Sequence, residues 1–172
     1  MTSPTITPER IKSNAAYRKY LKVLEKVESM DLASIVREAK SLHAGRTSRT
    51  LHTSDIGPKT LTEALFKDLS YRARMVELRV NVSDKRDRLH TTVDVVRRYL
   101  MHRYGEKLGL KSQISKRQFF DTLFREGIET MARMQSISEM LDLFVKDIDQ
   151  AGYALKNAVA LLQLVYKPET KI

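Results

Sequence analysis

The residues with the clearest chemical potential are arginines and lysines that alternate with tyrosines and apolar residues between positions 71 and 104. Basic side chains neutralise phosphates, and tyrosine rings and guanidinium planes stack on unpaired bases. This mixture is typical of a surface for single-stranded nucleic acid. The candidate contact residues are Arg72, Arg74, Arg79, Lys85, Arg86, Arg88, Arg97, Arg98, Tyr99, His102, Arg103 and Tyr104.

Five of these arginines fall along roughly one side of a helix, where a continuous stripe could follow a phosphate backbone. They are Arg72, Arg79, Arg86, Arg97 and Arg103. In the alternative interpretation, the arginines pair with neighbouring aspartates and two of the tyrosines belong to the core. The aspartates are Asp68, Asp84, Asp87 and Asp94, and the tyrosines are Tyr99 and Tyr104.

No pattern of catalytic or metal-binding residues accompanies this segment. The four histidines never share the i, i+4 spacing of a helical metal pair, and both GxxxxGK[ST] and GxGxxG are absent. Acid pairs such as Asp84 with Asp87, or Asp147 with Asp149, have basic neighbours and no convergent partners. We therefore expect a protein that is not an enzyme, with no catalytic residue, metal or cofactor.

The charge balance points to a polyanionic partner. The 172 residues carry 31 Lys and Arg against 21 Asp and Glu, a net charge of +10. Residues 1–60 and 61–111 each contribute +5, whereas residues 112–172 are neutral. This distribution suggests that anion binding and assembly use separate surfaces.

The cellular setting follows from what the sequence lacks. There are no cysteines, which favours a reducing interior and excludes thiolate zinc sites. No apolar run approaches the ~18 residues of a membrane span, and the N-terminus lacks the features of a signal peptide. We expect a soluble, cytoplasmic protein with no membrane partner.

Few glycines and prolines interrupt the chain, so an all-α fold is predicted. We expect an N-terminal helical hairpin over residues 1–45, with one helix from Pro8 to Glu28 and another that is capped by Ser29 or Asp31 and closed by Gly45. Residues 46–60 contain many Gly, Pro, Ser and Thr, which predicts a flexible basic linker that includes Arg46 and Arg49.

Residues 61–172 are predicted to form a helical domain for DNA binding and oligomerisation. One long helix, either continuous or kinked at Ser83, covers 61–104, and a turn follows at 105–112. Apolar residues then recur at steps of three and four from Phe120 to Tyr166, unless Gly152 breaks this helix. The expected architecture is a long helical hairpin or coiled-coil-like rod with the small N-terminal hairpin.

So long an apolar stripe exceeds what one compact domain of this size buries, so it predicts a homo-oligomer. The alternative is an antiparallel hairpin that satisfies the stripe within one chain. The residues predicted to mediate oligomerisation are Leu141, Phe144, Ile148, Tyr153, Leu155, Val159 and Leu162.

Three segments resemble the UvsY recombination mediators of T-even-type phages and their cyanophage relatives. Residues 140–148 and 152–159 are similar to that family's C-terminal signature, and residues 96–105 are similar to its basic stretch with paired tyrosines. The resemblance covers about 61–166. This chain has Arg-Tyr-Gly where the family has Tyr-Tyr-Ser-Gly, and its N-terminal region is longer and basic.

The resemblance implies a helical protein that assembles into rings, binds single-stranded DNA and helps a RecA-like recombinase replace single-strand-binding protein. By position, Arg97 and Arg98 match basic residues implicated in DNA contact, and Tyr153 to Val159 match the helix associated with assembly. The implied setting is the cytoplasm of a phage-infected bacterial host.

The leading hypothesis is therefore a single-stranded-DNA-binding recombination mediator. Two alternatives stay open at this point. One is a helical scaffold or adaptor whose basic residues are solvated, and it predicts no response to DNA. The other is an architectural protein that prefers double-stranded DNA or RNA.

Overall fold

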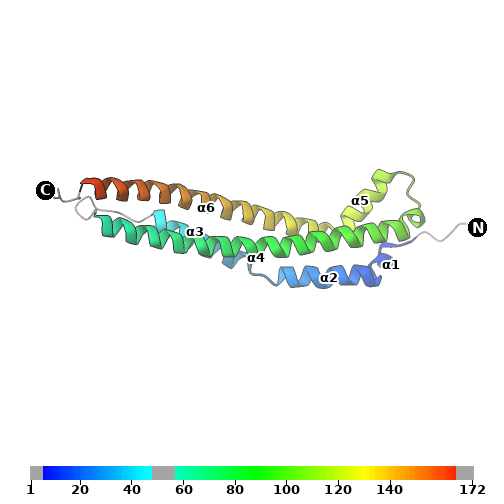
Figure 1. Cartoon of the computed structure of the whole chain (residues 1–172). Coiled ribbons are helices and arrows are strands. Elements are labelled where there is room, and N and C mark those ends of the chain that lie inside the picture. The colour runs from blue at the N-terminus through cyan, green and yellow to red at the C-terminus, as the bar shows by residue number, and fades with distance from the viewer. Residues whose placement is uncertain (1–5, 48–56, 166–172) are drawn as a thin grey trace, which may run out of the picture. The chain divides into compact units, whose positions relative to one another are not determined.

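The computed structural model describes residues 6–47 and 57–165, and every regular element in these ranges is helical (Figure 1). The prediction of an all-α fold is therefore confirmed. No helix in these ranges is both long and apolar enough to span a membrane. The elements are α1 (Pro8–Lys12), α2 (Ala15–Glu28), α3 (Leu32–Thr47), α4 (Pro58–Tyr104), the 3-10 helix η2 (Gly105–Leu108), α5 (Gln113–Leu123) and α6 (Arg125–Val165).

The chain forms two compact units, and each unit is assembled from two separate stretches of sequence. Unit 1 contains Met1–Leu32 and Val82–Ser136, and unit 2 contains Ala33–Asn81 and Ile137–Ile172. Helices α4 and α6 each contribute one part to both units. This division differs from the expected one at residues 45 and 60, because α2 and α3 belong to different units.

Unit 1 is centred on an aromatic cluster that joins α2 to the start of α6. The Tyr20 ring lies 5.4 Å from that of Tyr17 and 4.8 Å from that of Phe124. The Gly127 N–H donates a hydrogen bond of 3.1 Å to Tyr20 Oη. A Cβ at Gly127 would lie 2.7 Å from the same oxygen, so only glycine allows this approach.

Unit 2 packs α3 against the first part of α4 and the last part of α6. The ring of His43 on α3 stacks on Phe144 at 4.2 Å, and its Nε2 lies 2.9 Å from Asp147 Oδ2. Burial lowers the pKa of His43, and the positive charge of Arg46 lowers it further. The buried apolar side chains of this unit include Ile35, Ala39, Leu61, Met75, Leu78, Leu141 and Ile148.

The predicted single helix from Pro8 to Glu28 is wrong, because the chain breaks at Ser13 and Asn14. Asn14 caps α2: its Oδ1 accepts a hydrogen bond of 2.8 Å from the Ala16 N–H. Its Nδ2 donates to Tyr104 Oη at 2.9 Å. The same side chain therefore starts α2 and ties it to the end of α4.

Of the other boundaries near the N-terminus, the end of α2 at Glu28 and the start of α3 after Asp31 agree with the prediction, whereas the end at Gly45 does not. Ser29 ends α2, since its hydroxyl donates to the Lys26 carbonyl at 2.9 Å, and α3 begins at Leu32. Gly45 does not end α3, which continues to Thr47. A Cβ at Gly45 would lie 3.5 Å from Tyr71 Oη, so α3 packs closely against α4 at this position. The linker expected at 46–60 is thus helical at both ends, and Arg49 lies outside the described residues.

The two long helices agree with the prediction over most of their length. Helix α4 is helical through Ser83, and α6 is helical through Gly152. The stripe expected to be continuous from Phe120 is instead split between α5 and α6 at Phe124, whose backbone leaves the helical region. The turn predicted at 105–112 is confirmed, with Gly109 at φ 69° and the Ser112 side chain capping α5.

Candidate nucleic-acid interface

Three of the five arginines predicted to form one stripe lie on the side of α4 that is turned toward α6: Arg72, Arg79 and Arg86. Arg103 lies beside Tyr99 on another face instead. In unit 2, Arg72 Nε lies 2.6 Å from Asp149, and Arg79 Nε lies 2.8 Å from Asp142. In unit 1, the next arginine in the series, Arg86, donates to Gln135. Each step of seven residues forward on α4 matches seven residues backward on α6, as expected for antiparallel helices whose facing positions repeat every two turns.

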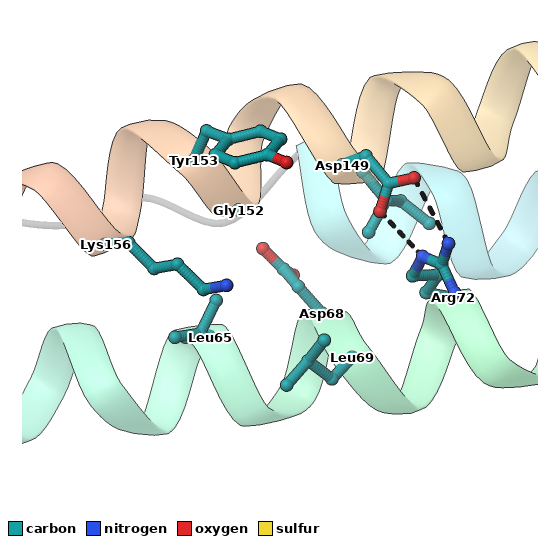
Figure 2. A pocket seen from close by; sticks show the side chains of 9 residues that line it. Leu65, Asp68, Leu69, Arg72, Asp149, Gly152, Tyr153 and Lys156 are labelled. Atoms are coloured by element: carbon teal, nitrogen blue, oxygen red, sulfur yellow. Dashed lines mark hydrogen bonds and ion pairs between the residues drawn. The ribbon is translucent and has the colours of Figure 1, made fainter.

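The guanidinium group of Arg72 is paired with one carboxylate through two hydrogen bonds. Its Nε and Nη2 donate to the two carboxylate oxygens of Asp149 at 2.6 and 3.3 Å, and this hydrogen bonding raises the pKa of Arg72 (Figure 2). The pair lines a pocket of about 280 Å³ between α4 and α6, together with Tyr153, Lys156 and Asp68. A phosphate at Arg72 would have to displace Asp149.

Two further candidate arginines form ion pairs. Arg74 donates to Glu38 on α3 at 2.6 Å, which holds the pKa of that carboxyl below its usual value. Arg97 lies 2.7 Å from Asp121 on α5. Most partners of the predicted arginines therefore come from other helices, at positions that the sequence alternative did not name.

A second face of α4, in unit 1, keeps its basic side chains available. Lys85 and Arg88 form no ion pair within residues 6–47 and 57–165. The Arg98 side chain is 80% exposed, and its guanidinium comes no nearer than 3.8 Å to Asp94. His102 is exposed as well.

Tyrosines lie beside this second face. Arg103 is 5.9 Å from the centre of the Tyr99 ring and donates to its hydroxyl at 2.8 Å. That hydrogen bond raises the pKa of Arg103. Tyr99 is 42% exposed, whereas Tyr104 is half-buried by its bond to Asn14. The Tyr99–Arg103 pair thus offers an accessible planar surface.

A groove runs between α2 and α4 in unit 1, which we call the α2–α4 groove. It consists of two adjoining hollows of about 860 and 390 Å³ that share Thr91 and Thr92. Sequence reasoning found its α4 wall but missed its α2 wall, although Lys19, Lys22 and Lys26 recur at helical steps. Its lining residues are Ala16, Lys19, Val23, Lys26, Val27, Asp84, Lys85, Asp87, Arg88, Thr91, Thr92, Val95, Val96 and Tyr99.

The residues predicted to mediate oligomerisation separate into two groups. Leu141 and Ile148 are buried inside unit 2, and Phe144 is covered by His43, so the fold itself uses these three side chains. Tyr153 is 70% exposed, and Leu155, Val159 and Leu162 are half-buried. Two exposed leucines on the same stretch, Leu161 and Leu164, were not predicted.

The net charge is unequally divided between the units. Unit 1 contains 18 Lys and Arg against 11 Asp and Glu, or +7, whereas unit 2 contains 13 against 10, or +3. The more basic unit is therefore also the one that holds the available face of α4.

Comparison with known proteins gives no relative. No family model matches the chain, no curated protein matches it, and no solved structure does so. In the described ranges, no cluster of three or more His, Asp or Glu side chains could hold a metal ion.

Proposed function

We propose that this protein is a non-enzymatic mediator of DNA recombination that binds single-stranded DNA and helps a RecA-like recombinase replace single-strand-binding protein. The observation that carries the proposal is the available basic face of α4 in unit 1. Lys85, Arg88, Arg98 and Arg103 supply positive charge there, and Tyr99 lies among them. The similarity of residues 96–105 to the basic stretch of the UvsY family supports the same assignment.

Single-stranded rather than duplex DNA is favoured by the exposed Tyr99–Arg103 pair. A base that stacks on an aromatic side chain contributes about 1–3 kcal/mol, and only an unpaired base presents its whole face. The cations beside the pair neutralise phosphates and release counterions, so binding weakens as salt rises. The site therefore combines both components of single-strand binding.

Assembly would multiply the few phosphate contacts that one subunit makes, by raising their effective concentration. The exposed surface of α6 from Tyr153 to Leu164 is the candidate contact. Residues 157–165 carry no charge, and Leu161 and Leu164 are exposed. Because this surface carries no charge, a second copy of the basic chain can pack against it without repulsion between like charges. The proposed homo-oligomer uses this end of α6 and not Leu141 or Ile148.

The test is fluorescence anisotropy of a labelled oligo-dT at several salt concentrations, with the mass of the complex measured by light scattering. We expect tight, strongly salt-dependent binding by an oligomer, and competition by single strands that is stronger than competition by duplex DNA or RNA. Preference for duplex DNA or RNA would favour an architectural protein. Absence of binding at low salt would reject the proposal.

A scaffold or adaptor is the second candidate, and one observation favours it. Arg72, Arg74, Arg79 and Arg97 are already paired with carboxylates, so a large part of the basic character of α4 serves the fold. A scaffold would be indifferent to DNA in the same anisotropy measurement. Its binding surface would then be the exposed apolar side chains of unit 2.

A further inference from the structure

We infer that α2 forms the second wall of the DNA site, so that a single strand lies in the α2–α4 groove and lysines of both helices hold its phosphates. This inference rests on the proposed function and assigns its binding site. It gives the basic N-terminal helices a direct role, although the sequence places them far from the basic segment of α4.

The cations of α2 are placed along the groove. Lys19 and Lys26 line the groove, and Lys22 lies between them at helical spacing. All three side chains are exposed. Lys85 and Arg88 line the groove from α4. Cations on both walls contact a strand from two sides, which one helix face cannot do.

The groove floor offers an apolar side chain and a hydroxyl to a base. Val95 is 58% exposed although it lies among basic residues, and the stacked face of a base would remove it from water. The Thr92 hydroxyl donates to the Arg88 carbonyl at 2.8 Å, which leaves its oxygen as an acceptor for a base amine. Tyr99 closes the groove at its far end.

The groove is long enough for several nucleotides. Lys85 and Tyr99 are fourteen residues apart on α4, which corresponds to about 21 Å at 1.5 Å per residue. Successive phosphates of one strand are spaced about 3.4 Å along the axis of B-form DNA and farther apart in an extended strand, so several nucleotides fit. Single-strand sites commonly span about four nucleotides or more.

Contacts within unit 1 also fix the position of α2, and with it the groove. The Asn14 side chain joins the start of α2 to Tyr104, and Tyr20 anchors the middle of α2 through Gly127 and Phe124. A site formed before binding avoids part of the ordering cost of association. The α2 wall is therefore a fixed part of unit 1.

Two carboxylates line one end of the groove and oppose a phosphate there. Asp87 is compensated, since its Oδ1 accepts from Arg86 Nε and Nη2 at 3.0 and 2.8 Å. Asp84 lines the same end and is exposed. Removing the charge of Asp84 should strengthen DNA binding about twofold.

The experiment compares three double variants of the full chain with the wild type, by oligo-dT anisotropy over a salt series. Lys19→Gln with Lys26→Gln removes the α2 cations, and Lys85→Gln with Arg88→Gln removes those of α4. The matched control, Lys40→Gln with Lys146→Gln, removes two exposed lysines of unit 2. We expect about tenfold weaker binding for each groove variant, and a salt slope lower by about 1.4, since each single-strand phosphate contact contributes about 0.7.

The outcomes separate the inference from the proposed function. If the α4 variant loses affinity while the α2 variant matches the control, the inference is overturned and the proposed function stands. If the wild type binds no DNA, both fail. Circular dichroism and thermal unfolding confirm that each variant is folded, which we expect because every replaced side chain except the half-exposed Lys85 is exposed.

Discussion

The two parts of α4 use the same type of side chain for different purposes. In unit 2, Arg72, Arg74 and Arg79 each meet a carboxylate on α3 or α6. In unit 1, Lys85 and Arg88 meet the lysine-rich face of α2 instead. What an α4 cation does is thus decided by the helix packed beside it: acidic neighbours make it structural, and basic neighbours leave its charge available.

The ion pairs of unit 2 contribute little stability each. The side chains of the Arg72–Asp149 pair are both 41% exposed, and half-exposed pairs of this kind are typically worth about 0–1 kcal/mol. Their main effect is to occupy the guanidinium groups and to favour one register of α4 against α6. The comparison between the units can therefore be tested by changing affinity and stability separately.

The largest expected effect is on DNA affinity when the groove charges of unit 1 are reversed. Lys85→Glu with Arg88→Glu should weaken oligo-dT binding about 100-fold at low salt, because two phosphate contacts become repulsive. The matched change in unit 2, Arg72→Gln with Arg79→Gln, should change affinity less than twofold and lower the melting temperature instead. Equal losses of affinity in the two variants would contradict the comparison.

The second effect is a loss of stability at alkaline pH, which originates in unit 1. Burial raises the pKa of Tyr20 to about 12, so the folded state favours the neutral phenol. The unfolded tyrosine ionises near pH 10, and stability present below pH 10 is therefore lost as the pH rises toward 12. We expect a loss of about 1–2 kcal/mol over this window.

Thermal unfolding from pH 9 to 11.5 measures this effect, and Tyr20→Phe provides the control. That variant loses the hydrogen bond from Gly127 and is less stable at neutral pH, but its stability should depend less on pH. An unchanged pH dependence in Tyr20→Phe would assign the alkaline transition to another group.

The third effect separates two adjacent arginines. Arg97 is paired with Asp121, whereas Arg98 is largely exposed, so Arg97→Gln should cost about 1 kcal/mol of stability and Arg98→Gln almost none. DNA affinity should respond in the opposite way, with about a threefold loss only in Arg98→Gln. Chemical denaturation and anisotropy of the two single variants measure both quantities. A larger affinity loss in Arg97→Gln would place that guanidinium on DNA.

The smallest expected effect is a gain in DNA affinity when the paired arginines of unit 2 are released from their carboxylates. Asp142→Asn with Asp149→Asn removes the carboxylates that hold Arg79 and Arg72. The freed guanidinium groups should tighten oligo-dT binding about two- to threefold at low salt, with a stability loss of about 1 kcal/mol. Anisotropy at two salt concentrations is the measurement. No gain in affinity would show that the lower net charge of unit 2, and not pairing, limits its contact with DNA.

The glycines predicted the turn at 105–112, whereas Arg103, expected on the arginine stripe, lies beside Tyr99 on the second face. Helical periodicity predicted the all-α fold and a common side for Arg72, Arg79 and Arg86. It could not predict that this side faces α6, because a repeat of residue types defines a face but not what lies against it. The break at Asn14 was hidden for a related reason. Asn14 caps α2 by accepting from the Ala16 N–H, and its Nδ2 donates to Tyr104 Oη, ninety residues away.

The α2 wall of the groove was the main omission. The spacing of Lys19, Lys22 and Lys26 is visible in the sequence, but such lysines are common on solvated helix faces. Their importance follows from the hydrogen bond between Asn14 and Tyr104 and from the shared groove lining, which place α2 beside α4. That hydrogen bond joins residues ninety positions apart, and local patterns do not report it.

The interleaved origin of the two units constrains how the chain is completed during synthesis. Unit 1 cannot close until residue 136 has been translated, and unit 2 must wait for the final stretch of α6. Helices α2 and α3 are therefore made early and remain without their partners on α6 while nearly a hundred further residues emerge. For the same reason, deleting residues 1–45 removes α1 and α2 from unit 1 and most of α3 from unit 2, so the N-terminal region is an integral part of the fold and not a detachable appendage.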